Sequence, residues 1–115
     1  MIPEKFKQRF DGDSGVDIGT ESFDAEFPDG ELRTITLRLG QPFYRDDYFW
    51  IRAELENLDR TDGPLGGESS LDAILTGVAF IIRRLEIYSS IHGLRYYWPG
   101  TKEPYDIKMY YLVPK

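Results

Sequence analysis

One stretch constrains the fold more than any other: residues 69–90, SSLDAILTGVAFIIRRLEIYSS, have the pattern of an amphipathic helix. Their large apolar side chains recur at intervals of three and four, which places them on the one helix face that packs against a core. That face comprises Leu71, Ile74, Leu75, Val78, Ile81, Ile82, Leu85 and Tyr88. The outer face carries Thr76, Phe80, Arg83, Glu86 and Ile87, of which Phe80 and Ile87 are unexpectedly apolar.

The ends of this helix carry recognisable capping residues. Ser69 and Asp72 have the spacing of an N-terminal capping pair, and Gly93 is placed to end the helix in a left-handed conformation. Gly77, inside the helix, is expected to allow close approach to a strand.

Short segments of alternating polarity precede the helix and predict strands. Residues 21–27 and 32–39 flank Pro28-Asp29-Gly30, which has the composition of a tight turn, so they predict a β-hairpin. Residues 48–56 predict a third strand. The predicted inward residues are Phe23, Ala25, Phe27, Ile35, Leu37, Leu39, Phe49, Ile51, Ala53 and Leu55.

Residues 94–98 and 107–113 predict two further strands after the helix, and residues 43–47 and 57–67 predict connections. The expected fold class is α+β: an antiparallel sheet of four to five strands, in the order β-β-β-α-β-β, with one long helix packed on one face. A length of 115 residues predicts a single domain, 1–115, in which residues 1–20 form an acidic, loosely structured N-terminal arm.

The composition removes several classes of function. Cysteine is absent, which excludes disulfides, thiolate metal sites and cysteine nucleophiles. The N-terminus lacks the apolar segment of a secretory signal, and no apolar stretch is long enough to span a bilayer. We therefore expect a soluble, cytoplasmic protein of bacterial type with no membrane association.

Charge is distributed unevenly along the chain. The net charge of −6 lies entirely within residues 1–31, and between Asp11 and Glu31 there are eight acids and no base. Nucleic acid is an improbable partner for such a chain, because phosphate binding requires a basic face. Two interpretations stay open: the acidic segment binds a basic protein surface, or it serves only solubility.

Motifs for catalysis or metal binding are weak. Residues 11–17 (DGDSGVD) resemble a calcium loop, but Gly15, Val16 and Ser22 stand where an EF-hand requires an oxygen ligand, a glycine and a glutamate. His92 is the sole histidine, and no serine lies in a nucleophile elbow. Glu54 and Glu56 share a strand face, but nothing places them across a cleft. We expect no enzyme, no cofactor and no metal. The alternative function is a small-ligand or calcium-binding module that uses the loop from Asp11 to Asp17, and a third is an enzyme built on Glu54, Glu56 and His92.

Aromatic residues exceed what a small core requires. Tyr44, Tyr48, Trp50, Tyr97, Tyr110 and Tyr111 mostly alternate away from the predicted core, and Tyr and Trp are enriched at protein interfaces. Together with the acids, they predict a partner-binding surface. The candidate residues are Asp11, Asp13, Asp17, Glu21, Asp24, Tyr44, Asp46, Asp47, Tyr48, Trp50, Glu54, Glu56 and Tyr97.

Several segments together resemble a family of small uncharacterised bacterial proteins. These segments are 32–39 with Gly40-Gln41-Pro42, the aromatic strand around Trp50, 66–75 (GGESSLDAIL) and 94–100 (LRYYWPG). The family has a strand ending in Gly-x-Pro, a Ser-Leu-x-Ala-Leu helix start and a closing Leu-x-Trp strand. This chain departs at 67–74, where the usual Gly-Val-Asp-Ser-Leu-Gln-Ala-Leu is replaced by Gly-Glu-Ser-Ser-Leu-Asp-Ala-Ile, and the segment before Glu31 lies outside the match.

Proteins of this type are similar to the immunity proteins encoded beside polymorphic or contact-dependent toxins. The resemblance implies a protein that binds the C-terminal domain of a cognate toxin and blocks its active site. An acidic binder suits a basic, nuclease-type toxin, since such a toxin must hold phosphate. The expected partner is therefore a toxin domain.

Overall fold

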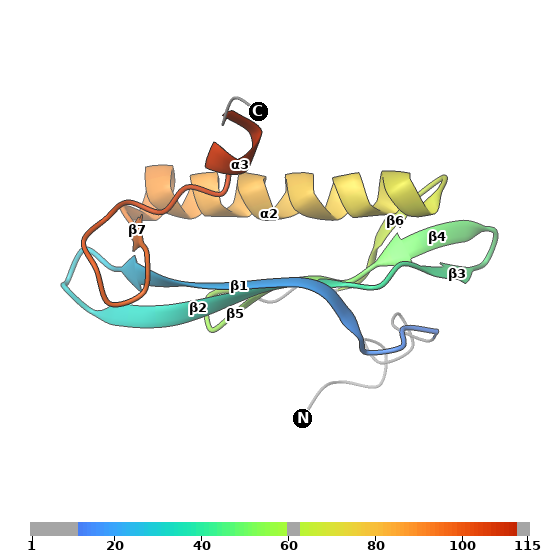
Figure 1. The fold of residues 1–115 in the computed structure, drawn as a ribbon, viewed down its shortest axis with the longest axis horizontal. Helices are drawn as coiled ribbons and strands as arrows, with labels where there is room; N and C mark the ends of the chain where they lie inside the picture. The colour runs from blue at the N-terminus through green and yellow to red at the C-terminus, as the bar shows by residue number, and fades with distance from the viewer. Residues whose placement is uncertain (1–11, 60–62, 113–115) are drawn as a thin grey trace.

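The computed structural model describes residues 12–59 and 63–112, the last two by their backbone only (Figure 1). Over these residues the elements follow in the order β1 (Asp17–Glu26), β2 (Leu32–Gly40), β3 (Phe43–Arg45), β4 (Tyr48–Ile51), β5 (Ala53–Glu56), β6 (Leu65–Gly67), α2 (Ser70–His92), β7 (Arg95–Tyr97) and α3 (Met109–Leu112). The strands form two antiparallel sheets, one with the order β5-β2-β1-β7 and one with the order β3-β4-β6. The predicted α+β class and the helix-covered antiparallel sheet are confirmed.

The predicted hairpin is the centre of the larger sheet. β1 and β2 pair in register from Glu26↔Leu32 back to Gly19↔Leu39. The turn closes with the N–H of Gly30 donating to the carbonyl of Phe27, and Gly30 has a positive φ of 91°. The alternation also placed the core correctly, since Phe23, Ile35 and Leu37 are buried.

The predicted third strand, 48–56, is divided between the two sheets. β4 pairs with β3 and β6, while β5 pairs with β2. Arg52 is the break between them, and its carbonyl accepts a hydrogen bond from the N–H of Gly40. Ile51, Ala53 and Leu55 are all buried as predicted, so the division leaves the alternation of core residues intact.

Three predicted loops contain strands, and one predicted strand is a helix. β1 begins at Asp17, inside the predicted N-terminal arm, while β3 and β6 lie in the predicted connections. The prediction of a strand over 107–113 is wrong: α3 spans Met109–Leu112, and residue 113 lies outside the described residues. Asp106 starts this helical turn, because its side chain accepts from the N–H of Lys108 and its carbonyl accepts from the N–H of Met109.

The long helix has the predicted caps. Ser69 is the N-cap and its hydroxyl accepts from the N–H of Asp72, while the carboxylate of Asp72 accepts from the N–H of Glu68. Gly93 caps the other end with φ 70°. Gly67 of β6 lies close to the start of α2, where a Cβ would be 2.5 Å from the backbone nitrogen of Ala73.

The buried face of α2 is rotated from the predicted one. Its buried residues are Ala73, Gly77, Ile81 and Leu85. A Cβ at Gly77 would lie 2.7 Å from Leu39 Cδ1, so the small residues allow the helix to approach the sheet closely, as predicted for Gly77. The larger side chains of Leu71 and Leu75 are consequently displaced to an exposed flank, against prediction. Phe80, predicted on the outer face, instead packs against the core.

α2 covers one face of the larger sheet, and no described helix or strand covers the other face (Figure 1). Within the described part of the chain, no helix has the length and apolar character needed to cross a membrane.

Candidate protein-binding hairpin

β3 and β4 form a hairpin that projects at one end of the molecule (Figure 1). Arg45 pairs with Tyr48, so the connecting loop consists of Asp46 and Asp47 alone. Both have positive φ, 53° and 67°, which defines a type I′ turn. This turn normally uses Asn-Gly, because a side chain at positive φ is strained. Two aspartates therefore occupy a turn for which glycine would be the more stable choice.

The hairpin tip, defined as Tyr44, Asp46, Asp47 and Tyr48, is strongly exposed. Tyr44 retains 62% and Tyr48 54% of its accessible surface, and the side chain of Asp46 retains 82%. Exposed tyrosines beside carboxylates present apolar area, hydrogen-bonding groups and negative charge on one small surface. These are the properties of a recognition surface for a basic protein.

Aromatic packing beneath the tip holds the hairpin rigid. The indole N–H of Trp50 donates to the carbonyl of Arg45 at 2.7 Å, and the Arg45 guanidinium lies over the Trp50 ring. Gly66 of β6 makes room for the indole, since a Cβ there would lie 3.3 Å from Trp50. Trp50 is half-buried. It therefore supports the hairpin and is not a freely exposed binding residue.

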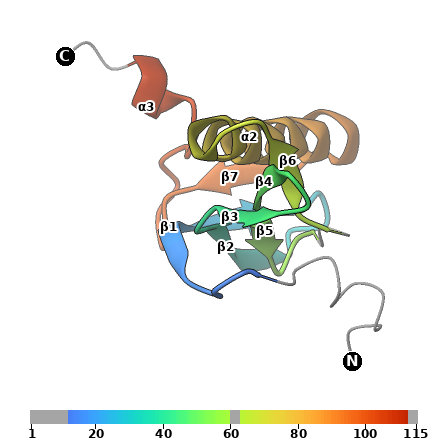
Figure 2. The same cartoon turned by 90° about the vertical axis from the view of Figure 1, so that its right-hand side faces the viewer.

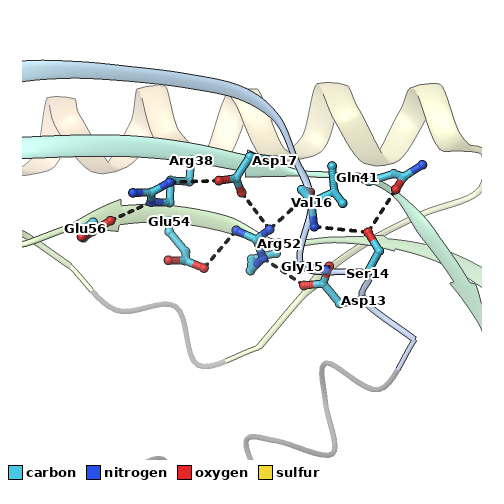
Figure 3. Close-up of polar contacts among 10 residues, drawn as sticks. All are labelled: Asp13, Ser14, Gly15, Val16, Asp17, Arg38, Gln41, Arg52, Glu54 and Glu56. Atoms are coloured by element: carbon cyan, nitrogen blue, oxygen red, sulfur yellow. Dashed lines mark hydrogen bonds and ion pairs between the residues drawn. The ribbon is translucent and has the colours of Figure 1, made fainter.

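A second group of predicted residues forms an ion-pair network around Arg52, at the break between β4 and β5 (Figure 3). Arg52 Nε lies 2.9 Å from Asp13, Nη2 lies 2.8 Å from Asp17, and Nη1 lies 3.2 Å from Glu54. Arg38 continues the network, 3.0 Å from Asp17 and 2.6 Å from Glu56. These contacts tie the segment before β1 to β2 and β5.

Because its acids are paired with arginines, the network argues against the predicted role of Asp13 and Asp17 as calcium ligands. Burial raises the pKa of Asp17, but hydrogen bonds from Arg52 and Arg38 outweigh this, so the pKa of Asp17 lies below its ordinary value. The predicted calcium ligands Asp13 and Asp17 therefore already neutralise arginine, and a cation would have to displace Arg52. Asp11 lies outside the described residues. Within residues 12–59 and 63–112, no cluster of three His, Asp or Glu side chains has the geometry to hold a metal.

The remaining candidates have structural partners of their own. Glu21 accepts a hydrogen bond from the hydroxyl of Tyr110, and Asp24 accepts from the N–H of Gly100 and the hydroxyl of Thr34. Lys102 lies 5.0 Å from the Tyr97 ring. The contacts of Gly100 and Tyr110 fasten the C-terminal segment to β1. The predicted candidates therefore form two groups: residues of one exposed hairpin, and residues whose contacts hold the scaffold together.

Two groups considered for catalysis lie apart. Glu54 and Glu56 point to the solvent-facing side of β5, in contact with arginines, while His92 ends α2 on the opposite face of the sheet and lies near Tyr88.

The turn itself was missed from the sequence, where residues 43–47 were predicted only as a connection. The sequence does place two aspartates between aromatic pairs. This pattern, however, lacks the glycine that usually identifies a two-residue hairpin. Comparisons with protein-family models, curated proteins and solved structures find no match to this chain.

Proposed function

We propose that this protein is a cytoplasmic immunity protein that neutralises a cognate, basic, nuclease-type bacterial toxin domain by binding it through the β3–β4 hairpin tip. The observation that carries the proposal is the gathering of Tyr44, Asp46, Asp47 and Tyr48 at an exposed two-residue turn. The family resemblance supplies the class of partner.

The geometry of the tip supports a role as the anchor of an interface. Tyr44 packs edge-on against Phe49, with ring centroids 5.2 Å apart, and Tyr48 packs edge-on against Trp50 at 6.3 Å. These contacts fix the tyrosines before binding, so little side-chain entropy is lost when a partner covers them. Rigid tyrosines of this kind are frequent interface hot spots.

Charge supports a basic partner. Asp46 and Asp47 stand at the tip, and Arg45 is the one cation among the described residues that pairs with Asp46, at 3.4 Å. Exposed interface charges act mainly on the association rate and its salt dependence, whereas aromatic anchors act on dissociation. The tip combines both kinds of residue.

The test is co-expression with the toxic C-terminal domain encoded by the gene immediately upstream. We expect rescue of cell growth by the wild-type chain. Tyr44→Ala and Tyr48→Ala should each weaken binding of the purified toxin domain by about 30-fold, the effect of losing about 2 kcal/mol at a hot spot. Tyr110→Ala is the matched control, because Tyr110 is similarly exposed but belongs to α3. Absence of rescue, or equal loss in the control, would refute the proposal.

A second variant separates stability from binding. Asp47→Gly places the preferred residue at positive φ and should stabilise folding by about 1 kcal/mol. The same variant removes a tip charge, so it should slow association with the toxin domain and reduce the salt dependence of the rate. Asp47→Asn controls for the charge alone. If Asp47→Gly leaves association unchanged, the acidic tip is not the docking surface.

A further inference from the structure

Residues 101–110, which follow β7, contact both the larger sheet and α2. Figures 1 and 2 show this segment passing along one side of the molecule on its way to α3. The ring of Tyr105 is stacked on Phe23 of β1, with centroids 4.5 Å apart, and Lys108 pairs with Glu86 of α2 at 3.0 Å. We call this segment the strap, because it bridges the two layers of the fold.

Most of the strap's attachment depends on one buried side chain. Tyr105 is 3% exposed, and its ring meets Trp98 edge-on with centroids 5.0 Å apart. Ile107 and Met109 are half-buried, and every other residue of the strap is exposed. Segments with few buried apolar contacts open at a lower free energy than the core around them. The strap is therefore expected to open before the rest of the fold.

Exposed polar contacts hold the remainder of the strap. Its side chains reach three carboxylates: Lys102 reaches Glu26, Lys108 reaches Glu86 and Tyr110 reaches Glu21. The two lysine side chains are 71% and 46% exposed, so solvent and salt weaken both ion pairs. The N–H of Tyr105 also donates to the carbonyl of Tyr96 in β7. These contacts fix the position of the strap but add little to the strength of its attachment.

The buried residue also destabilises the closed position. The hydroxyl of Tyr105 is buried and has no hydrogen-bond partner among the described residues. A buried hydroxyl without a partner is unfavourable, and opening would expose it to water, which supplies one. Tyr105 thus favours closure through its ring and opening through its hydroxyl.

Opening of the strap would enlarge an existing groove. The groove has a volume of about 770 Å³ and lies between the C-terminal half of α2, β7 and residues 104–108. The buried Leu85 and Leu94 are among its apolar lining residues. Tyr105 also lines the groove and covers Phe23, which is fully buried. With Tyr105 withdrawn, the groove would reach Phe23 and gain a flat apolar wall.

We propose that the strap opens as one unit while the larger sheet and α2 stay folded, and that its opening extends the groove to Phe23. The closed strap shields this apolar site. The open strap leaves a slot between Phe23 and Trp98 that accepts an aromatic ring in place of Tyr105. Gly100 is the hinge: it has a positive φ of 72°, and its N–H donates to Asp24, which keeps the chain before the strap on β1.

Trypsin measures the opening, because it cuts only segments that leave the folded surface. Lys102 and Lys108 lie in the strap, whereas Arg52 lies between β4 and β5 and reports unfolding of the sheets. Each cleavage rate is divided by that of a synthetic peptide with the same local sequence. We expect equal normalised rates after the two lysines, about 100-fold faster than after Arg52.

Two substitutions of Tyr105 move the opening in opposite directions. Tyr105→Ala removes the ring and should speed cleavage after both lysines by about 30-fold, while the helix signal in circular dichroism is retained. Tyr105→Phe keeps the ring, removes the unpartnered hydroxyl and should slow cleavage by about threefold. Binding of the fluorescent dye anilinonaphthalene sulfonate should increase in Tyr105→Ala and not in Tyr105→Phe, because the aromatic rings of the dye fit the vacated slot.

Three results would overturn the proposal. Equal normalised rates after Lys108 and Arg52 would show that the strap opens only when the whole fold unfolds. Fast cleavage after Lys108 but not after Lys102 would show fraying near α3 in place of one opening unit. Loss of the helix signal in Tyr105→Ala would show that the strap and α2 unfold together. None of these outcomes bears on toxin neutralisation, which the tip variants test separately.

Discussion

Replacing Arg52 by methionine tests whether the ion-pair network holds the segment before β1 onto the sheet. The substitution keeps most of the apolar stem and removes the guanidinium. Only 12% of the Arg52 side chain is exposed, and only 7% of Asp13 and 20% of Asp17, so both carboxylates would lose a cation in a place that water reaches poorly.

The magnitude follows from these contacts. A hydrogen bond to a charged group contributes about 1.5–3 kcal/mol, and a fully buried ion pair that loses one partner costs about 3–5 kcal/mol. Arg52 makes two near-buried contacts, 2.9 Å to Asp13 and 2.8 Å to Asp17. Once the guanidinium is gone, water partly solvates these two carboxylates, which lowers the cost of losing both contacts. We therefore expect Arg52→Met to lower the free energy of unfolding by about 3 kcal/mol, or Tm by about 12 °C.

Urea unfolding followed by circular dichroism measures this effect. Arg38→Met is the control, because Arg38 also binds two carboxylates but its own side chain and that of Glu56 are more exposed, so about 0.5–1 kcal/mol is expected. A loss below about 1 kcal/mol for Arg52→Met, or equal losses for the two variants, would contradict the reasoning that burial gives this network its strength.

Two further predictions concern titration and a buried hydroxyl. Because the pKa of Asp17 is lowered in the folded chain, its stabilisation is complete above the ordinary value of 3.8 and is lost as pH falls through the folded value. The difference in unfolding free energy between wild type and Asp17→Asn should thus shrink as pH is lowered from about 6 to about 3, and a constant difference would contradict the pairing. Tyr105→Phe should leave stability unchanged or raise it by up to about 1 kcal/mol, because the buried Tyr105 hydroxyl has no partner among the described residues. Tyr96→Phe should cost about 1 kcal/mol, since it loses the 2.8 Å bond to the carbonyl of Leu85, and thermal melts that rank the pair the other way would oppose this.

Local chemistry predicted the fold wherever pattern and packing agree. The β1–β2 hairpin followed from alternation and a Pro-Asp-Gly turn, and α2 followed from its period and caps. The division of residues 48–56 could not be predicted, because Ile51, Ala53 and Leu55 keep one period across the break at Arg52. Only tertiary pairing decides that β4 joins one sheet and β5 the other.

The helix face shows a different limit. Hydrophobicity favoured Leu71 and Leu75 as core residues, but the sheet selects Ala73 and Gly77, because small residues allow closer approach. Likewise, the sequence grouped Asp13, Asp17, Glu54 and Glu56 with the binding residues by charge alone. Their neutralisation depends on Arg52 and Arg38, which are distant from Asp13 and Asp17 along the chain.

The separation of β3, β4 and β6 into their own sheet has a consequence for evolution. Tyr44, Asp46, Asp47 and Tyr48 contribute nothing to the buried core, which is built from the larger sheet and α2 together with Ile51, Leu94 and Tyr105. Substitutions at these four positions can therefore accumulate or be exchanged as a unit while the scaffold keeps its sequence. A chain of this architecture can acquire a new specificity by replacing one short turn, and grafting a turn of different charge onto the same scaffold is the direct way to redesign it.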